Sequence, residues 1–307
     1  MTMSGSQCCG SVRRELQRKY FGFTEAHPAR FCFWQWRVPP LAILLYRFCV
    51  AAYTMFWVIY TSRNTPDTKI QEHSISIMAF LTTWTYIVLT VYLVLHFIIT
   101  CVHFLKSELG LLRRLTSENH RRLFHELQVQ PSLWGNQEYE YVPGTADGTD
   151  VELVITYSPN LLSKIVWILY NIASSASIMV TILFWALLFP YLPKEGDKYL
   201  LFNIQLHAVT SVIVILEHSL SAIPIRLQHA IFTLIYGLCY LTFAGIMYAV
   251  HHSNIFYPGV LDFSQPSRTA VMCVVVVFVV LPLIQLFLFG IYKFRMWLFD
   301  TCNPEEL

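Results

Sequence analysis

The stretch ISIMAFLTTWTYIVLTVYLVLHFIITCVHF, residues 75–104, decides the fold, because it contains no Lys, Arg, Asp or Glu. A helix needs about 20 apolar residues to cross the hydrocarbon core of a bilayer. The stretch therefore predicts a membrane-spanning helix, which is long enough to tilt or to extend beyond the bilayer. The whole chain agrees with this, since 55% of its residues are hydrophobic and only 13% are charged.

Five further apolar stretches have the length of a membrane span. They cover residues 41–60, 165–189, 202–223, 227–250 and 269–292. Prolines flank several of them, and Pro282 lies inside the last. We predict an all-α integral membrane bundle of six transmembrane helices within residues 39–304, after a basic and aromatic segment, residues 1–38, and with a tail, residues 293–307.

Lys and Arg residues predict the orientation, because they gather on the cytoplasmic side of membrane proteins. Fifteen of them fall in the amino-terminal segment, the loop 105–164, the fourth connection and the tail, against five on the other side. Both termini are therefore predicted to be cytoplasmic. Within the loop, residues 106–128 read as amphipathic helices on the membrane surface and residues 131–150 as a flexible loop.

Composition excludes several classes of function. A net charge of +2 gives no reason to expect nucleic-acid binding, and residues 1–38 contain no apolar core of a signal peptide. The eight cysteines lack metal-ligand spacing, so we predict neither a metal nor an organic cofactor. Cys8 and Cys9 are candidates for palmitoylation. The predicted location is the plasma membrane or the endoplasmic reticulum, and no protein partner can be named.

Polar residues recur along one face of two predicted spans. Thr82, His96 and His103 share a face of the second span. His207, Ser211 and His218 share a face of the fourth span, with Thr210 and Glu217 at its edges. Lipid cannot satisfy such groups, so both faces are predicted to point into the bundle.

Depth along each span divides these groups into two layers. The outer layer is predicted to hold Thr82 and His207, with His251 or His252 arriving from the end of the fifth span. The inner layer holds Arg47, His96, His218 and Glu217. Arg47 and Glu217 lie at similar depth with opposite charges, which predicts a structural ion pair. His96 and His218 leave a bis-histidine haem site open as a weaker alternative.

The outer layer contains the minimum set of groups for nucleophilic catalysis, a hydroxyl and an imidazole. A threonine hydroxyl attacks only when a base within hydrogen-bonding reach accepts its proton, and histidine serves as such a base near neutral pH. The same residues also occur in structural roles, since a threonine in a span commonly bonds the carbonyl four residues before it.

Several short motifs resemble known families. The segments Phe21-Gly22-Phe23, Trp34-Gln35-Trp36 and Leu45-Tyr46-Arg47, followed by Leu81-Thr82-Thr83-Trp84, resemble the rolling stone family of animal membrane proteins. Thr83 stands where that family usually has asparagine. This resemblance implies a plasma-membrane protein acting in cell–cell fusion or adhesion, of the myoblast-fusion type.

A more distant resemblance is to the androgen-induced family of transmembrane threonine hydrolases. Its motifs are similar to Phe80-Leu81-Thr82, to Asn203 and His207 with Glu217 ten residues on, and to Val250-His251-His252 with Tyr257-Pro258. The resemblance implies hydrolysis of fatty acid esters, with Thr82 as nucleophile, His207 as base, and His251 or His252 in support. The partners would be the lipid bilayer and an amphiphilic ester. Non-enzymatic fusion or adhesion and a purely structural role are the alternatives.

Overall fold

The computed structural model contains six helices that are long and apolar enough to cross a membrane. They are Pro40–Asn64, Leu81–Lys106, Leu161–Leu188, Leu200–Leu220, Leu227–Val250 and Pro266–Cys302. The structure describes residues 15, 21–23, 26, 28–36, 38–64, 68–70, 73–115, 135–143, 151–191, 197–250, 257 and 260–302. The predicted all-α bundle of six spans is thus confirmed, and the chain is a multi-pass membrane protein.

The elements follow one another with short irregular turns inserted into the long helices. The amino-terminal half contains η2 (Pro28–Phe31), α2 (Pro40–Asn64), β1 (Thr68–Ile70), β2 (His73–Ile75), η3 (Ile77–Ala79), α3 (Leu81–Leu115), β3 (Gly135–Pro143) and β4 (Val151–Pro159). The carboxy-terminal half contains α5 (Leu161–Leu183), η4 (Phe184–Leu188), η5 (Phe189–Tyr191), α6 (Asp197–His207), α7 (Val209–Leu220), η6 (Leu227–His229), α8 (Ala230–Val250), α9 (Pro266–Val275), η7 (Val276–Val280) and α10 (Leu281–Cys302).

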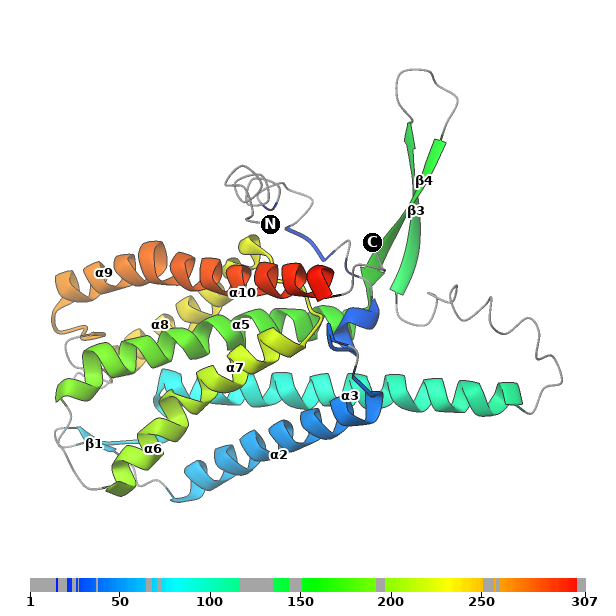
Figure 1. Cartoon of the computed structure of the whole chain (residues 1–307). Coiled ribbons are helices and arrows are strands. Elements are labelled where there is room, and N and C mark those ends of the chain that lie inside the picture. The colour runs from blue at the N-terminus through cyan, green and yellow to red at the C-terminus, as the bar shows by residue number, and fades with distance from the viewer. Residues whose placement is uncertain are drawn as a thin grey trace.

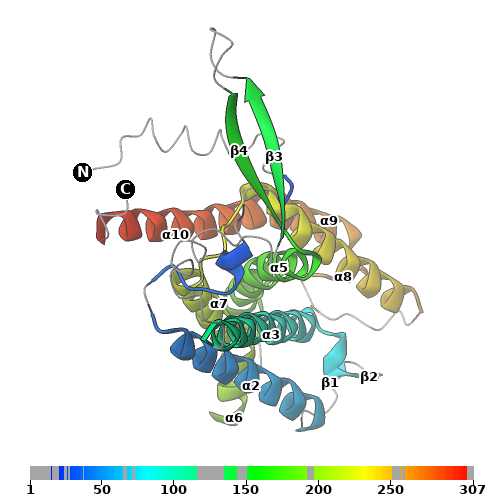
Figure 2. The same ribbon diagram turned by 90° about the vertical axis from the view of Figure 1, so that its right-hand side faces the viewer.

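The spans run side by side in alternating directions (Figures 1 and 2). Helices α3, α6 and α9 begin at one end of the bundle, which we call the Leu81 end. Helices α2, α5 and α8 begin at the opposite end, which we call the Pro40 end and from which the β3–β4 hairpin projects (Figure 1). Consecutive spans joined by short connections are expected to be antiparallel neighbours in this way.

Helix α5 is the centre of the bundle and packs against α3, α7, α8 and α10. Its middle carries a run of small buried residues, Ala173 to Ser177. Small side chains let neighbouring backbones approach closely, which is the main way helices associate in lipid. One serine also bonds across the interface, since Ser175 Oγ donates to Gln285 Oε1 of α10 at 3.0 Å.

The second and sixth spans differ from their predicted bounds. The second begins at Leu81 instead of residue 75, because the residues before it form β2 and η3. The sixth continues to Cys302, so the predicted tail from residue 293 is largely helical. Arg295 in it is buried, and its guanidinium donates to the carbonyls of His218 in the last turn of α7 and of Ile223 beyond it. A cation there satisfies carbonyls that the helix leaves unpaired.

The connection between the second and third spans was predicted only in part. Helix α3 itself extends to Leu115. Strand β3 lies within residues 131–150, where a flexible loop was predicted, and pairs antiparallel with β4 from Gly135↔Pro159 to Pro143↔Val151. Residues 138–142 read EYEYV and alternate as a strand does, a signal that the glycines and acidic residues of the segment outweighed in the loop prediction. The predicted surface helices beyond residue 115 lie outside the described residues.

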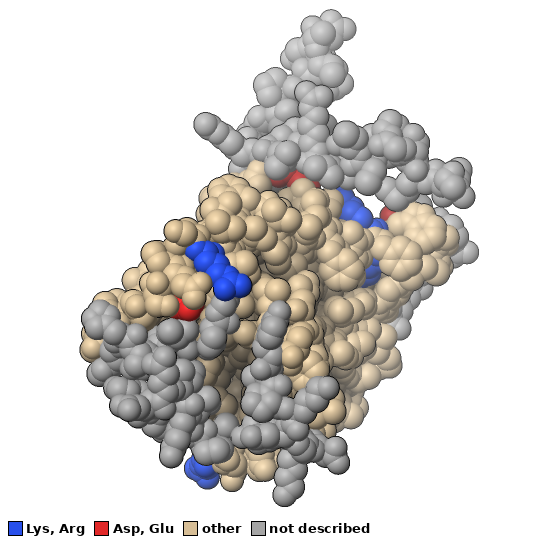
Figure 3. Space-filling view, turned by 90° about the vertical axis from the view of Figure 1, so that its left-hand side faces the viewer, with Lys and Arg blue, Asp and Glu red and all other residues tan. Residues whose placement is uncertain are grey.

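The described surface at the Leu81 end carries few charged side chains (Figure 3). Viewed from the Leu81 end, most of it belongs to neither acidic nor basic residues (Figure 3). Large apolar side chains such as Phe278, Leu201 and Phe56 are exposed along the spans. Such a surface is suited to lipid rather than to water.

Candidate active site

A cavity opens into the bundle near the Leu81 end, and its empty volume, including its mouth, is about 1030 Å³. The cavity is open to the surface of the bundle, and its walls are mostly apolar. Its lining comes from every span except the first, together with the connection before α9. The lining residues are Leu81, Thr82, Met179, Val180, Leu183, Phe184, Leu188, His207, Thr233, Leu234, Gly237, Leu238, Tyr240, Leu241, Tyr257, Val260, Leu261, Met272, Cys273, Val276, Val277 and Leu281.

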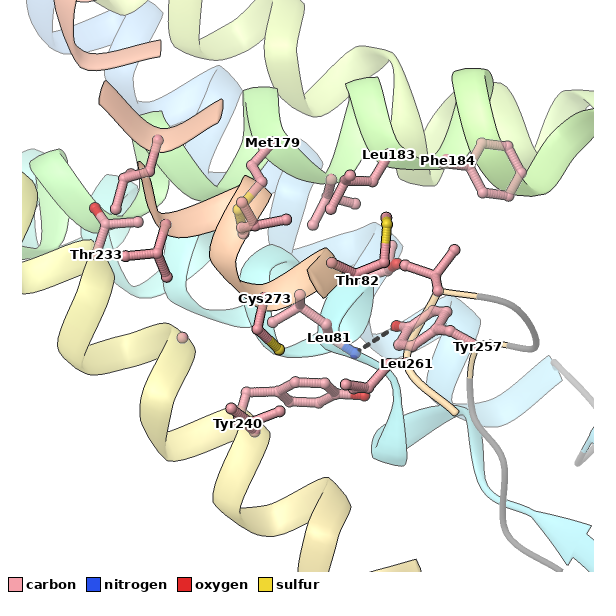
Figure 4. Close-up of a pocket in the computed structure, with 18 of the residues that line it drawn as sticks. Leu81, Thr82, Met179, Leu183, Phe184, Thr233, Tyr240, Tyr257, Leu261 and Cys273 are labelled. Carbon is pink, nitrogen blue, oxygen red and sulfur yellow. Dashed lines mark hydrogen bonds between the residues drawn. The ribbon is translucent and has the colours of Figure 1, made fainter. Parts of the chain in front are cut away.

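Thr82 lies in the first turn of α3 and is buried. The short turn η3, capped by Ser76, precedes this helix directly. The first N–H groups of a helix have no carbonyl partner within it, and that of Leu81 donates to the Tyr257 hydroxyl at 2.9 Å. Figure 4 shows Thr82 beside Tyr257 at this helix start. The neighbouring Thr83 instead donates to the Ile77 carbonyl at 2.8 Å and does not line the cavity.

His207 is the last residue of α6, where the fourth span is broken before α7. The Thr181 hydroxyl of α5 donates to the His207 carbonyl and lies 2.7 Å from Ser211 Oγ, so a side chain is inserted at the break. The imidazole stacks on Phe184, with ring centroids 3.5 Å apart and planes 1° from parallel. Its Nδ1 is buried and makes no hydrogen bond with any described residue, although it is a strong polar group.

The irregular parts of the helices converge on this cavity. The π-helical turn η4 contributes Phe184, and the π-helical turn η7 contributes Val276. The break between α6 and α7 contributes His207. Single π-helical turns within α-helices often occur at functional sites, since they are less stable than regular helix. The cavity therefore combines polar residues with helix segments that are less stable than a regular α-helix.

The predicted outer layer is only partly described by the structure. Thr82 and His207, 125 positions apart in the chain, line one cavity, but no hydrogen bond joins the two in the described structure. His251 and His252 lie outside the described residues. Tyr257 was missed as a site residue, and its only signal was the Tyr257-Pro258 motif, to which no role was attached.

The predicted inner layer forms a second, fully buried cluster toward the Pro40 end. The Arg47 guanidinium donates to the Cys32 carbonyl at 3.0 Å and to the Thr100 hydroxyl. The Glu217 carboxylate accepts from the Tyr92 hydroxyl at 2.9 Å and lies 3.6 Å from His96 Nδ1. The predicted direct Arg47–Glu217 ion pair is not seen, although Arg47 Nη2 and Glu217 Oε1 are both buried without a hydrogen-bond partner among the described residues.

The hydrogen bonds of His96 determine how many protons this cluster holds. Its Nε2 lies 2.9 Å from the Phe31 carbonyl, which can only accept, so Nε2 carries a proton. Its Nδ1 and Glu217 Oε2 each lie 2.9 Å from the Tyr92 hydroxyl. The Tyr92 hydroxyl has one proton, so it bonds both neighbours fully only when His96 Nδ1 or Glu217 carries a further one.

Replacing Tyr92 with phenylalanine is expected to lower the free energy of unfolding by about 1–3 kcal/mol, the cost of leaving buried polar groups unpaired. The hydroxyl lost in this variant serves both His96 and Glu217. Thermal unfolding in detergent would measure the change, with Tyr60→Phe on the exposed face of α2 as the matched control. Equal unfolding temperatures for the two variants would contradict the assigned bonds.

Comparison with known proteins identifies a similar protein. The family described as Protein rolling stone matches residues 158–302, from the end of β4 to the end of α10. Protein rolling stone from Drosophila melanogaster is 23% identical over 300 residues, covering 94% of this chain and 90% of that protein. No solved structure matches. The predicted resemblance to rolling stone is confirmed, whereas the resemblance to the androgen-induced family stays a prediction.

Proposed function

We propose that this rolling stone-like membrane protein is an intramembrane hydrolase of fatty-acyl esters, with Thr82 as nucleophile and His207 as base. One observation carries the proposal: Thr82 and His207, from separate spans, line the same largely apolar cavity. The Nδ1 of His207, unpartnered among the described residues, supports it, because a base must have a ring nitrogen free to accept a proton. No cofactor is needed for this chemistry.

The substrate class follows from the lining of the cavity. Leucine, valine and methionine side chains supply most of the wall, so a hydrocarbon chain can lie there as it does in lipid, whereas a charged group would be costly. The polar residues Thr82, His207 and Tyr257 suit a single polar group such as an ester carbonyl. The partners we propose are therefore the bilayer and an amphiphilic ester that enters from it.

The predicted orientation is part of this proposal. Both termini would face the cytoplasm, because the basic residues of the chain gather on that side of the spans. The Leu81 end, with Thr82 and His207, would then lie near the opposite leaflet of the plasma membrane or endoplasmic reticulum.

A fluorophosphonate probe with an alkyl tail tests the covalent mechanism directly. We expect the purified wild-type protein to be labelled, and Thr82→Ala to abolish labelling, since the probe reacts with an activated hydroxyl. Thr83→Ala is the matched control, because Thr83 is adjacent but bonds the Ile77 carbonyl outside the cavity. Equal labelling of wild type and Thr82→Ala would refute the nucleophile and favour a non-enzymatic role.

A further inference from the structure

Tyr257 reaches the cavity from the connection between α8 and α9. Its ring packs edge-on against Phe80, with centroids 5.8 Å apart, and its hydroxyl lies 2.9 Å from the Leu81 nitrogen. Figure 4 shows this hydrogen bond, with the Thr82 side chain next to it. The phenol oxygen therefore sits at the start of α3, where the helix has its positive end.

The surroundings of this phenol make it a neutral hydrogen-bond donor. Burial raises the pKa of Tyr257, while hydrogen bonds with Tyr240, Leu81 and Thr82 lower it in part. The net increase keeps the proton on the oxygen at neutral pH. An oxygen that accepts one hydrogen bond becomes a stronger donor of its own, because hydrogen bonds polarise one another.

We infer that Tyr257 is a catalytic residue whose hydroxyl donates to the ester carbonyl oxygen as that oxygen becomes negative. This inference rests on the proposed hydrolase function. It is carried by the hydroxyl's placement, since it contacts the first turn of α3 and lines the same cavity as Thr82 and His207. A donor fixed before the reaction stabilises the developing charge without reorganising, which is commonly the largest electrostatic contribution in acyl transfer.

The reaction balances with water as the only co-reactant. Thr82 Oγ1 bonds to the carbonyl carbon while its proton passes to His207, and the π electron pair moves onto the oxygen held by Tyr257. When the pair returns, the bond to the alcohol breaks and the alcohol takes the proton from His207. Water then attacks the acyl-threonine by the same steps and releases the acid. Tyr257 keeps its proton throughout.

Kinetics of Tyr257→Phe in the full-length, detergent-purified protein test the inference. We expect kcat to fall about 10²–10³-fold with KM little changed, as for loss of one oxyanion donor. The fall should be similar for p-nitrophenyl decanoate and an alkyl decanoate, because both pass through the same oxyanion. Tyr236→Phe is the matched control, since the Tyr236 hydroxyl lies 3.1 Å from Thr85 Oγ1 and this tyrosine does not line the cavity.

A second variant covers the case in which Tyr257→Phe fails to fold. Replacing Tyr257 with difluorotyrosine keeps its shape but lowers the phenol pKa, so activity should be lost at a lower pH than in wild type. An unchanged pH profile, or wild-type kcat in Tyr257→Phe, would overturn the role of Tyr257. If hydrolysis in either case still depends on Thr82, the proposed function survives. Absence of any Thr82-dependent hydrolysis in wild type would instead defeat both.

Discussion

Replacing Thr82 with alanine, His207 with glutamine, or both together is expected to lower kcat for fatty-acyl esters by a similar factor, about 10⁴–10⁶ in each case. A nucleophile and its base act as one unit, so removing either one also removes most of what the other contributes to kcat. The two residues line one cavity, and His207 Nδ1 has no competing hydrogen bond among the described residues. Turnover of p-nitrophenyl decanoate by the three purified variants would measure these factors.

The comparison of single and double variants distinguishes this mechanism from a packing role. If the two residues only packed helices, their effects would appear in stability and would add, since independent sites usually do. Thermal unfolding of each variant therefore accompanies the kinetics, and Thr83→Ala controls for changes in the first turn of α3. A double variant much slower than either single variant would contradict their action as a unit.

Hydrophobic patterning predicted the membrane region well because uncharged apolar stretches of about 20 residues are rare outside membrane spans. The burial of the polar faces also followed from the sequence: His96, Ser211 and His218 are all buried. Lipid offers such groups no hydrogen-bond partner, so they must face the interior of the bundle whatever the details of helix packing. The same reasoning placed Thr82 and His207 at similar depth, and both line the cavity.

The details that were missed depend on contacts between distant segments. Arg295 was assigned to a tail because basic residues usually mark the end of a span, yet carbonyls at and just beyond the end of α7 supply it with partners. Arg47 bonds the carbonyls of Phe31 and Cys32 instead of Glu217, and Glu217 bonds Tyr92. Depth along a span does not show which of several groups at one level will bond. The break after His207 contains neither proline nor glycine, and the inserted Thr181 hydroxyl comes from another span.

Filling the cavity from α8 is expected to have the second large effect. Gly237 lines the cavity, and a Cβ built on it has no atom within 4 Å, so Gly237→Phe can project its ring into open space. For an ester dissolved as monomers in water, a ring that denies the cavity to about six methylenes removes about 5 kcal/mol of binding, or about 10³–10⁴-fold in kcat/KM for a long chain. Hydrolysis of p-nitrophenyl acetate, which has no chain to place, should change far less.

Gly290→Phe is the matched control for this experiment. Gly290 lies in α10, and its Cβ would likewise meet nothing within 4 Å, but it does not line the cavity. Both substitutions remove a glycine from a helix interior, which by itself favours the helix by roughly 0.5 kcal/mol or more. A loss of long-chain turnover confined to Gly237→Phe would locate the acyl chain between α8 and the other walls of the cavity. Equal losses in both variants, or losses equal for acetate and decanoate, would mean that the chain binds elsewhere.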